Sequence, residues 1–482
     1  MATLGLLFCL TTLVQAQAEP ASLRPNILIV LVDDMRFDQM THEGHPYIET
    51  PNLDRLAVEG VRFTNAYVTS PLCGPSRASL VTGRQPSIHG RLHNHVYPAL
   101  DPYLPAVFRP AGYRTAMIGK FYEGADFADE LRDQTFDRWF QNGGPYWPDF
   151  EGEPEDRKAR RAFYDARLYY DQFYDIDGQT RRVMGHQTDV LFDEASRFAL
   201  ESVEADRPFM MLLNPFAPHT PLNPSLERKG KHAGKGIPPR PNQVFGELGP
   251  MNNAHNHARI REVHERGSEM IEDVDAAMGR LLENLQTAGV LDETLIVFTS
   301  DNGTVHGEHG FWWKMNFWEE AVRIPLLMRY PKLIEAGTAS DALVSISDLL
   351  PTAAELGGVA IPEDANRYGR SLVPHLREGI AGLRDHLLCM QFSQLASRED
   401  VTDTELMWAS LKSQDGWKLI AQRVPSPQRP ELPKFQLFHL LEDPFEMWNL
   451  AESDEHQARL GHMKNQLAEA LSANAAPYAW VR

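Results

Sequence analysis

Short runs of apolar residues, in which neither face is polar, recur along the chain up to about Met328. The clearest are residues 26–32, 115–118, 209–213, 295–299 and 324–328. Runs of this length are typical of parallel strands that helices cover on both faces. Segments with apolar residues at helical spacing lie between them, as in residues 264–288. Strands that alternate with helices predict an α/β domain built on a large, mostly parallel sheet flanked by helices.

The pattern changes beyond His375. Short apolar segments separated by polar turns follow, at residues 386–392, 415–423 and 435–441, and residues 453–471 then have the spacing of one amphipathic helix. We therefore expect a main domain of residues 22–375. A smaller C-terminal unit of residues 376–482, with an antiparallel sheet and a helix, should pack on it.

Two stretches lack a sustained period and resemble insertions. Residues 149–182 are rich in Arg, Asp and Tyr, and residues 223–256 are rich in Pro, Gly and Asn. Long loops of this kind often shape a substrate pocket, although a solvated surface excursion explains each one equally well.

The first eighteen residues have the pattern of a secretory signal peptide. They are apolar through Val14, and Ala16 and Ala18 provide a small-residue cleavage site. The alternative is a buried N-terminal strand or helix, since no Lys or Arg precedes the apolar run. No later run reaches membrane-spanning length, so we expect a secreted or periplasmic protein without a membrane span.

The charge and the cysteine content exclude some classes of protein. The chain has 66 Asp and Glu against 47 Lys and Arg, a net charge of −19, which argues against a nucleic-acid binder. Its three cysteines, Cys9, Cys73 and Cys389, are too few for a disulfide framework. Cys9 would leave with the signal peptide, and Cys389, in an apolar strand, is most simply a buried small hydrophobe.

Polar residues follow directly where the predicted strands end. Asp33 and Asp34 follow the first run, and Asp301 and Asn302 follow the fourth. Lys120 and His219 come after the second and third runs. Ligands of open α/β sheets bind beyond the carboxyl ends of the strands, so these side chains should share one site.

The two acidic pairs offer hard oxygen ligands without sulfur or imidazole. Such a set predicts Ca²⁺, with Mg²⁺ or Mn²⁺ as alternatives. Either pair alone has a simpler explanation, because Asp-Asp after a strand is a common helix cap and Asp-Asn-Gly is a common turn. Because both pairs follow predicted buried strands, a metal site is favoured over a helix cap and a turn.

Residues 70–84 predict a helix that begins near Cys73. Pro75 suits the first turn of a helix, and helical spacing continues to a glycine stop at Gly83. Cys73 would then lie at a helix N-terminus, where free N–H groups favour an anion, and Arg77 would lie one turn further along. The alternative interpretation is that Cys73 is an isolated cysteine in a turn with a purely structural role.

The motif Cys73-Gly74-Pro75-Ser76-Arg77, followed by Leu80-Val81-Thr82-Gly83-Arg84, resembles the signature of the type I sulfatases of the alkaline-phosphatase-like superfamily. The resemblance extends in family order from Asn26 to about Leu450. It implies an alkaline-phosphatase-like fold and hydrolysis of a sulfate ester to an alcohol and inorganic sulfate. It also implies that a formylglycine-generating or equivalent maturing enzyme converts Cys73 to formylglycine (3-oxoalanine).

The resemblance assigns a role to each residue of the predicted site. Asp33, Asp34, Asp301, Asn302 and the modified residue 73 would hold the metal. One hydroxyl of the hydrated formylglycine would attack sulfur, and the other would later expel sulfate. Arg77, Lys120 and Lys314 would neutralise the sulfate oxygens, and His219 would protonate the leaving oxygen.

The chain departs from the family pattern at Tyr122, where many sulfatases have a histidine. His89 could substitute for it, or could equally be a packing residue. His93, His95 and His309 are possible substrate contacts. The aromatic run Phe311-Trp312-Trp313 beside Lys314 could pack on a sugar ring, although packing in the core is the simpler explanation.

The segments GKFYEG and FAPHTP resemble the glucosamine-6-sulfatase branch, which predicts a sulfated carbohydrate as substrate. Two alternatives stay open at this point. One is a phosphonate or phosphodiester hydrolase of the same superfamily, and the other is a non-catalytic protein that binds sulfated glycans with an unmodified Cys73. The sequence leaves open the sugar, the sulfate position and the oligomeric state.

Overall fold

The computed structural model describes residues 24–94, 104–120, 132, 135–142, 168–243, 254–363, 368–379, 382–392, 406–423, 432–477 and 479–481. The predicted signal peptide, His95 and Tyr122 lie outside these ranges. Within them, no helix is both long and apolar enough to cross a membrane.

A ten-stranded sheet forms the centre of the molecule, in the order β13-β2-β12-β9-β1-β8-β4-β5-β6-β7. Its central part is parallel and consists of β1 (Asn26–Val32), β8 (Phe209–Asn214), β9 (Thr294–Ser300), β4 (Arg114–Gly119) and β5 (Arg138–Asn142). The outer strands are β12 (Leu326–Arg329), β2 (Val61–Phe63), β13 (Thr338–Ser340), β6 (Phe173–Ile176) and β7 (Gln179–Arg182). The predicted mostly parallel sheet is confirmed.

The fifth apolar run differs from the others in direction. It overlaps β12, which pairs antiparallel with both β9 and β2. An apolar run indicates that a strand is buried on both faces. Burial alone does not determine whether the strand runs parallel or antiparallel to its neighbours. The predicted insertion at 149–182 also differs in part, because its described end forms the antiparallel hairpin β6–β7 at the sheet edge.

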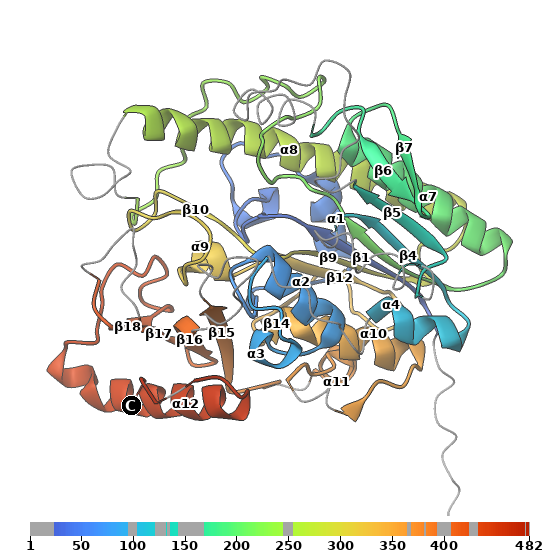
Figure 1. Ribbon diagram of the computed structural model, residues 1–482. Coiled ribbons are helices and arrows are strands. Elements are labelled where there is room, and N and C mark those ends of the chain that lie inside the picture. The colour runs from blue at the N-terminus through green and yellow to red at the C-terminus, as the bar shows by residue number, and fades with distance from the viewer. Residues whose placement is uncertain are drawn as a thin grey trace, which may run out of the picture.

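Helices cover both faces of this sheet (Figure 1). The long α8 (Ala254–Thr287), α7 (Gln187–Glu204) and α1 (Pro51–Glu59) lie on one face. On the other face lie α2 (Cys73–Thr82), α4 (Leu104–Phe108) and α10 (Leu349–Gly357). Alternate residues of β1 accordingly enter two different cores, Leu28 and Val30 in one and Ile27 and Ile29 in the other. This two-sided burial explains the uninterrupted apolar run.

The C-terminal region forms the predicted antiparallel sheet and helix. Its strands are β15 (His386–Phe392), β16 (Leu406–Ser413), β17 (Trp417–Gln422) and β18 (Phe435–His439). The helix α12 (Gln457–Ala473) buries Met463 and Leu467 against this sheet. Cys389 and Trp408 on the sheet join the core of the main domain. The domain boundary after residue 375 stays a prediction.

Other short elements lie among the described residues. They include the paired strands β3 (Ala66–Tyr67) and β14 (Val344–Ser345), the hairpin strands β10 (Val305–His306) and β11 (Trp312–Trp313), and the helices α3 (Pro86–His89), α9 (Glu319–Val322) and α11 (Val373–Glu378).

Candidate active site

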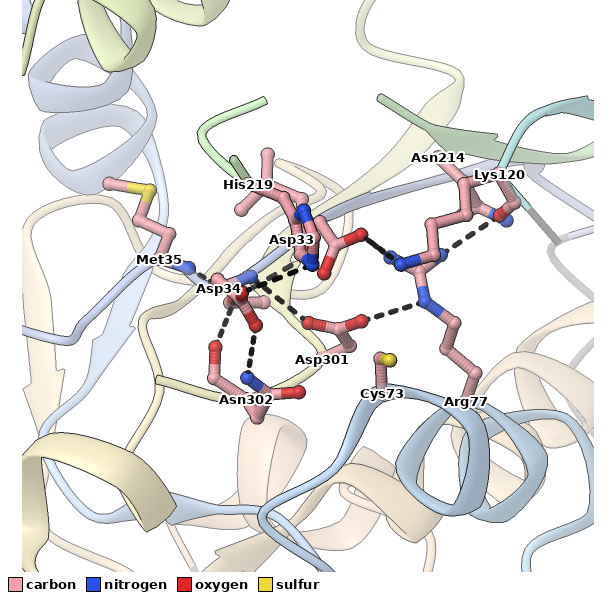
Figure 2. Close-up of polar contacts among 12 residues, drawn as sticks. Asp33, Asp34, Met35, Cys73, Arg77, Lys120, Asn214, His219, Asp301 and Asn302 are labelled. Carbon is pink, nitrogen blue, oxygen red and sulfur yellow. Dashed lines mark hydrogen bonds and ion pairs between the residues drawn. The ribbon is translucent and has the colours of Figure 1, made fainter. Parts of the chain in front are cut away.

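The ends of β1 and β9 bring the two acidic pairs together (Figure 2). The amide of Asp34 donates to Asp301 Oδ1 at 3.2 Å, and Asn302 Nδ2 donates to Asp34 Oδ1. All four residues are buried. Asp34 has φ +69°, a left-handed conformation that non-glycine residues rarely adopt. The two loops thus form one acidic centre.

Several oxygens of this centre point at no donor. Within the part of the chain that the structure describes, Asp33 Oδ1, Asp34 Oδ2 and Asn302 Oδ1 are buried and accept no hydrogen bond. A buried acceptor without a donor is costly, and a cation would satisfy several of them at once. Ligand atoms of Asp33, Cys73 and Asp301 lie within 4.8 Å of one another. The donor set therefore fits a hard divalent cation such as Ca²⁺.

Cys73 begins helix α2, as predicted, and its thiol faces the acidic centre (Figure 2). Asn94 Nδ2 donates to Cys73 Sγ at 3.2 Å, and Lys314 Nζ lies 3.8 Å from the same sulfur. Asn94 also accepts from the amide of Gly74 at 2.9 Å. A Cβ on Gly74 would meet Asn94 Oδ1 at 2.5 Å, so only glycine leaves room for this contact.

Asn94 is a site residue that the sequence interpretation missed. It lies in a loop 21 positions after Cys73, where no periodic pattern marks it. The one available signal is its place between His93 and His95, which the sequence analysis predicts as possible substrate contacts.

Three cations surround the same carboxylates. Arg77 Nε donates to Asp301 Oδ2 at 2.7 Å, Lys120 Nζ donates to Asp33 Oδ2, and Lys314 Nζ donates to Asp34 Oδ1 at 2.8 Å. Such an array of buried cations beside a helix N-terminus is suited to a tetrahedral oxyanion.

These contacts shift the acidity of the site. Burial would raise the pKa of Asp33, but Lys120, His219 and Arg77 together hold that pKa well below its usual range. Burial raises the pKa of Asp301 to about 6, because Arg77 offsets only part of the desolvation cost. Burial would lower the pKa of Lys314, but Asp34 raises it above its usual value. Asp301 is thus short of positive charge, which a bound cation would supply.

Comparison with known proteins identifies the family. The profile described as "Sulfatase" matches residues 25–359, and the profile described as "N-sulphoglucosamine sulphohydrolase, C-terminal" matches residues 307–473. The chain belongs to the sulfatase family. The predicted class of enzyme, a sulfuric ester hydrolase, is thereby confirmed.

Relatives of this sulfatase are named for several substrates. It is 30% identical to the N-acetylglucosamine-6-O-sulfatase of Bacteroides thetaiotaomicron, over 73% of this chain and 71% of that protein. It is 27% identical to the ulvan-active sulfatase of Formosa agariphila, over 73% of this chain and 64% of that protein. It is 30% identical to the human N-acetylgalactosamine-6-sulfatase, over 74% of this chain and 66% of that protein.

Solved structures share the fold of this sulfatase. A protein in complex with its substrate D-glucosamine-2-N,6-O-disulfate superposes with a TM-score of 0.77 and 26% identity, over 94% of this chain and 98% of that chain. The phosphonate monoester hydrolase of Agrobacterium radiobacter superposes with a TM-score of 0.67 and 22% identity, over 93% of this chain and 96% of that chain. The second likeness shows a common fold alone.

His219 of the sulfatase reaches the acidic centre from the loop after β8 (Figure 2). Its Nδ1 lies against the carbonyl oxygen of Thr220, which can only accept, so Nδ1 carries the proton of the neutral ring. Its Nε2 lies 3.6 Å from Asp34 Oδ2. Burial lowers the pKa of His219, and Asp33 and Asp34 offset only part of that effect.

The other predicted histidines of the sulfatase lie in different surroundings. His89 has Nε2 at 3.0 Å from Ser79 Oγ, its Nδ1 accepts from the amide of Arg91, and burial lowers its pKa to about 3. His309 stacks on Trp318 with ring centroids 3.6 Å apart. His93, which precedes Asn94 in the sequence, is buried. The roles suggested for these histidines stay predictions.

Proposed function

We propose that this sulfatase hydrolyses a sulfate ester on a carbohydrate, such as a glucosamine 6-sulfate or a related glycan sulfate. One observation carries the proposed reaction: Cys73, at a helix N-terminus, faces buried oxygens that lack donors and three buried cations. This arrangement matches what sulfate ester hydrolysis requires, namely a nucleophile, a metal site and compensation for the charge on the sulfate oxygens.

Asp33, Asp34, Asp301 and Asn302 would hold the metal, together with residue 73. Ca²⁺ fits their all-oxygen chemistry, and Mg²⁺ or Mn²⁺ are the alternatives. When bound, the ion would supply Lewis-acid polarisation of a sulfate oxygen and lower the pKa of a nearby hydroxyl. The buried oxygens of the acidic centre that accept no hydrogen bond support this assignment.

Cys73 would work as formylglycine, made by a formylglycine-generating or equivalent maturing enzyme. Formylglycine supplies a hydrated aldehyde, whose hydroxyl is the nucleophile and whose second hydroxyl allows sulfate to leave again. Asn94 and Lys314 contact the thiol from two sides, so both would hold residue 73 in one orientation towards the metal site.

Arg77, Lys120 and Lys314 would bind the sulfate oxygens and stabilise the charge that moves during transfer. In its doubly protonated form, His219 would give the Nε2 proton to the departing alcohol oxygen and return to the neutral ring, whose remaining proton stays on Nδ1 against the carbonyl of Thr220. The depressed pKa of His219 makes its protonated form a strong acid for this step.

The carbohydrate substrate is inferred from the relatives, whose names specify N-acetylglucosamine 6-O-sulfate, N-acetylgalactosamine 6-sulfate and ulvan. The proposed location is secreted or periplasmic, and the signal-like residues 1–18 are its support.

Two measurements on protein purified from its native host test the proposal. The mass of the peptide that contains Cys73 should correspond to formylglycine, and the protein should release sulfate from N-acetylglucosamine 6-sulfate. Cys73→Ala should abolish release without unfolding the chain. An intact thiol throughout, or faster turnover of phosphonate monoesters and phosphodiesters than of any sulfate ester, would contradict the proposal.

A further inference from the structure

Two adjacent tryptophans on the β10–β11 hairpin have different surroundings. Trp312 lies opposite His306 in the hairpin, and the guanidinium of Arg259 lies 5.2 Å from the centre of its ring. Trp313 instead meets the His219 ring edge-on, with centroids 5.6 Å apart and an interplanar angle of 78°. Trp313 thus contacts the group that would protonate the leaving alcohol.

The backbone of this segment is unusual at Trp313 and Met315, which have φ +77° and +68°. Left-handed conformations cost a bulky residue about 1–3 kcal/mol and cluster at functional sites. Successive side chains of a regular strand point to opposite faces. Here Trp313 and Lys314 both reach the site, and Lys314 Nζ lies 5.7 Å from the centre of the Trp313 ring.

The hairpin is fixed by buried polar contacts. Glu308, in its turn, accepts from the amide of His306 and forms an ion pair with Arg36 at 2.7 Å. The amide of Gly307 donates to the carbonyl of Phe311 at 3.0 Å. Both Glu308 and Arg36 are buried. The Trp313 ring is therefore held on a supported hairpin rather than on a free loop.

Trp313 lines a small pocket that opens beside the acidic centre. Its other walls include Asp34, His219, Thr220, Leu222 and Val263. The pocket thus combines an aromatic face and aliphatic side chains with a hydroxyl group and the reacting histidine. The pocket has a free volume of about 20 Å³, room for about one water, so a pyranose ring would lie at its mouth, with its apolar C–H face against the partly exposed Trp313.

We propose that Trp313 is the platform on which the pyranose ring bearing the sulfate stacks, and that it gives the enzyme its preference for sugar sulfates over other sulfates. This inference rests on the proposed function, which places the leaving oxygen at His219. The carbon skeleton attached to that oxygen then extends from His219 along the Trp313 ring. Trp313 thereby contributes to binding of the sugar and not of the sulfate group.

Binding to the catalytically inactive Cys73→Ala protein with Ca²⁺ separates the two contributions. Isothermal titration with N-acetylglucosamine 6-sulfate should show about 10- to 50-fold weaker binding after Trp313→Ala. Affinity for inorganic sulfate should change less than about 2-fold, since the cations are untouched. Trp313→Phe should keep most of the sugar affinity because a flat ring remains.

Trp312 provides the matched control on the same hairpin. Trp312→Phe should leave the ratio of sugar-sulfate to inorganic-sulfate affinity within about 2-fold. In the mature enzyme, Trp313→Ala should raise KM for the sugar sulfate more than it lowers kcat. Thermal unfolding of each variant reports whether the hairpin has been lost.

Equal affinity of the Cys73→Ala protein and its Trp313→Ala derivative for the sugar sulfate would overturn the inference. Parallel losses of sugar-sulfate and inorganic-sulfate affinity would overturn it too, because Trp313 would then only support the cations. Failure of the proposed function shows separately, as an unsubstituted mature enzyme that releases no sulfate from sugar sulfates. Trp313-dependent sugar binding would support the platform in either case.

Discussion

Two of the buried clusters of charged residues in the described part of the chain differ in how completely their members are paired. The first, the active-site cluster, consists of Asp33, Asp34, Asp301, Arg77, Lys120 and Lys314. The second, which we name the seam cluster, consists of Tyr67, Glu319, Lys418 and Glu446, and it joins the C-terminal sheet to the main domain.

Three of the four carboxylate oxygens of the seam cluster accept a hydrogen bond, and the fourth, Glu446 Oε1, lies against the Lys418 ammonium without accepting one. Lys418 Nζ lies 2.8 Å from Glu319 Oε1 and 2.7 Å from Glu446 Oε1. Tyr67 Oη donates to Glu319 Oε2, and the amide of Glu319 donates to Glu446 Oε2, both at 2.8 Å. The seam cluster thus leaves one buried carboxylate oxygen without a hydrogen bond, and a cation of the chain lies beside that oxygen.

The active-site cluster has three cations for three carboxylates, and yet one oxygen of Asp33 and one of Asp34 accept no hydrogen bond. Burial of charge is common to both clusters and therefore does not identify the site. The distinguishing feature is the set of unsatisfied acceptors that face one point together with a nucleophile. A protein retains such costly groups where a ligand completes them.

The largest expected effect is at the acidic centre. Asp301→Asn should lower sulfate release by at least about 10³-fold, because it removes a metal ligand and the partner of Arg77. Chelation with EDTA should lower the unfolding temperature of the unsubstituted protein and leave that of the variant nearly unchanged.

Steady-state kinetics and thermal unfolding with and without EDTA check this prediction. Asp341→Asn, which alters an exposed carboxylate of the main domain, serves as control. Equal sensitivity of Asp301→Asn and the unsubstituted protein to EDTA would place the metal elsewhere.

The second effect is at the seam. Lys418→Met should lower the free energy of unfolding by about 3–5 kcal/mol, since it leaves Glu319 and Glu446 buried without their cation. The kcat of the folded fraction should stay within about 3-fold, because the seam cluster supplies no group to the reaction. Urea denaturation and kinetics on the same preparations measure both.

The double variant Lys418→Met, Glu446→Gln should recover part of the lost stability, because one stranded charge is removed. If kcat instead fell as steeply as in Asp301→Asn, the functional contrast between the two clusters would be wrong.

The smallest effect concerns Lys412, a buried lysine on β16 near the seam cluster. Burial lowers the pKa of Lys412 to about 8, and Glu319 offsets only part of this. Between that value and the usual lysine pKa the folded state binds fewer protons than the unfolded state, so stability rises with pH there. Below pH 8 Lys412 is charged in the folded state, and the full free-energy cost of burying its ammonium applies.

Lys412→Met removes this penalty and should stabilise the protein by about 1–2 kcal/mol at pH 7. The advantage should shrink as pH rises from 8 towards 10.5, the usual lysine value. Urea denaturation of both proteins at several pH values measures the difference. A constant difference across that range would show that Lys412 is not destabilised by its burial.

The sequence was most informative about site residues that directly follow a buried strand, at the edge of the sheet. Asp33, Asp34, Asp301 and Asn302 follow β1 and β9, which pair in parallel over their whole length, so their ends coincide. The apolar runs predicted both strands, and the shared edge followed from the α/β pattern. Cys73 and Arg77 were found through the cysteine motif and its helix signals.

Residues on irregular segments were harder to predict. Asn94 reaches Cys73 from a loop, and its place depends on long-range packing that no local pattern encodes. The aromatic run at 311–313 was noted, but the left-handed backbone that directs Trp313 to His219 follows from the tertiary structure. The direction of β12 was likewise hidden, because burial on both faces gives the same pattern either way.

The pairing of β1 with β9 sets the earliest moment at which the protein can fold. The amide of Asp34 and its partner Asp301 are 267 positions apart in the chain. A ribosome that adds about 5–20 residues per second needs on the order of tens of seconds to cover that distance. During this interval β1, all of whose residues are buried in the fold, lacks both neighbours until β8 is made and lacks β9 until the end. Expression hosts with abundant chaperones should therefore yield more folded enzyme than those without, because β1 must be shielded until β8 and β9 are made.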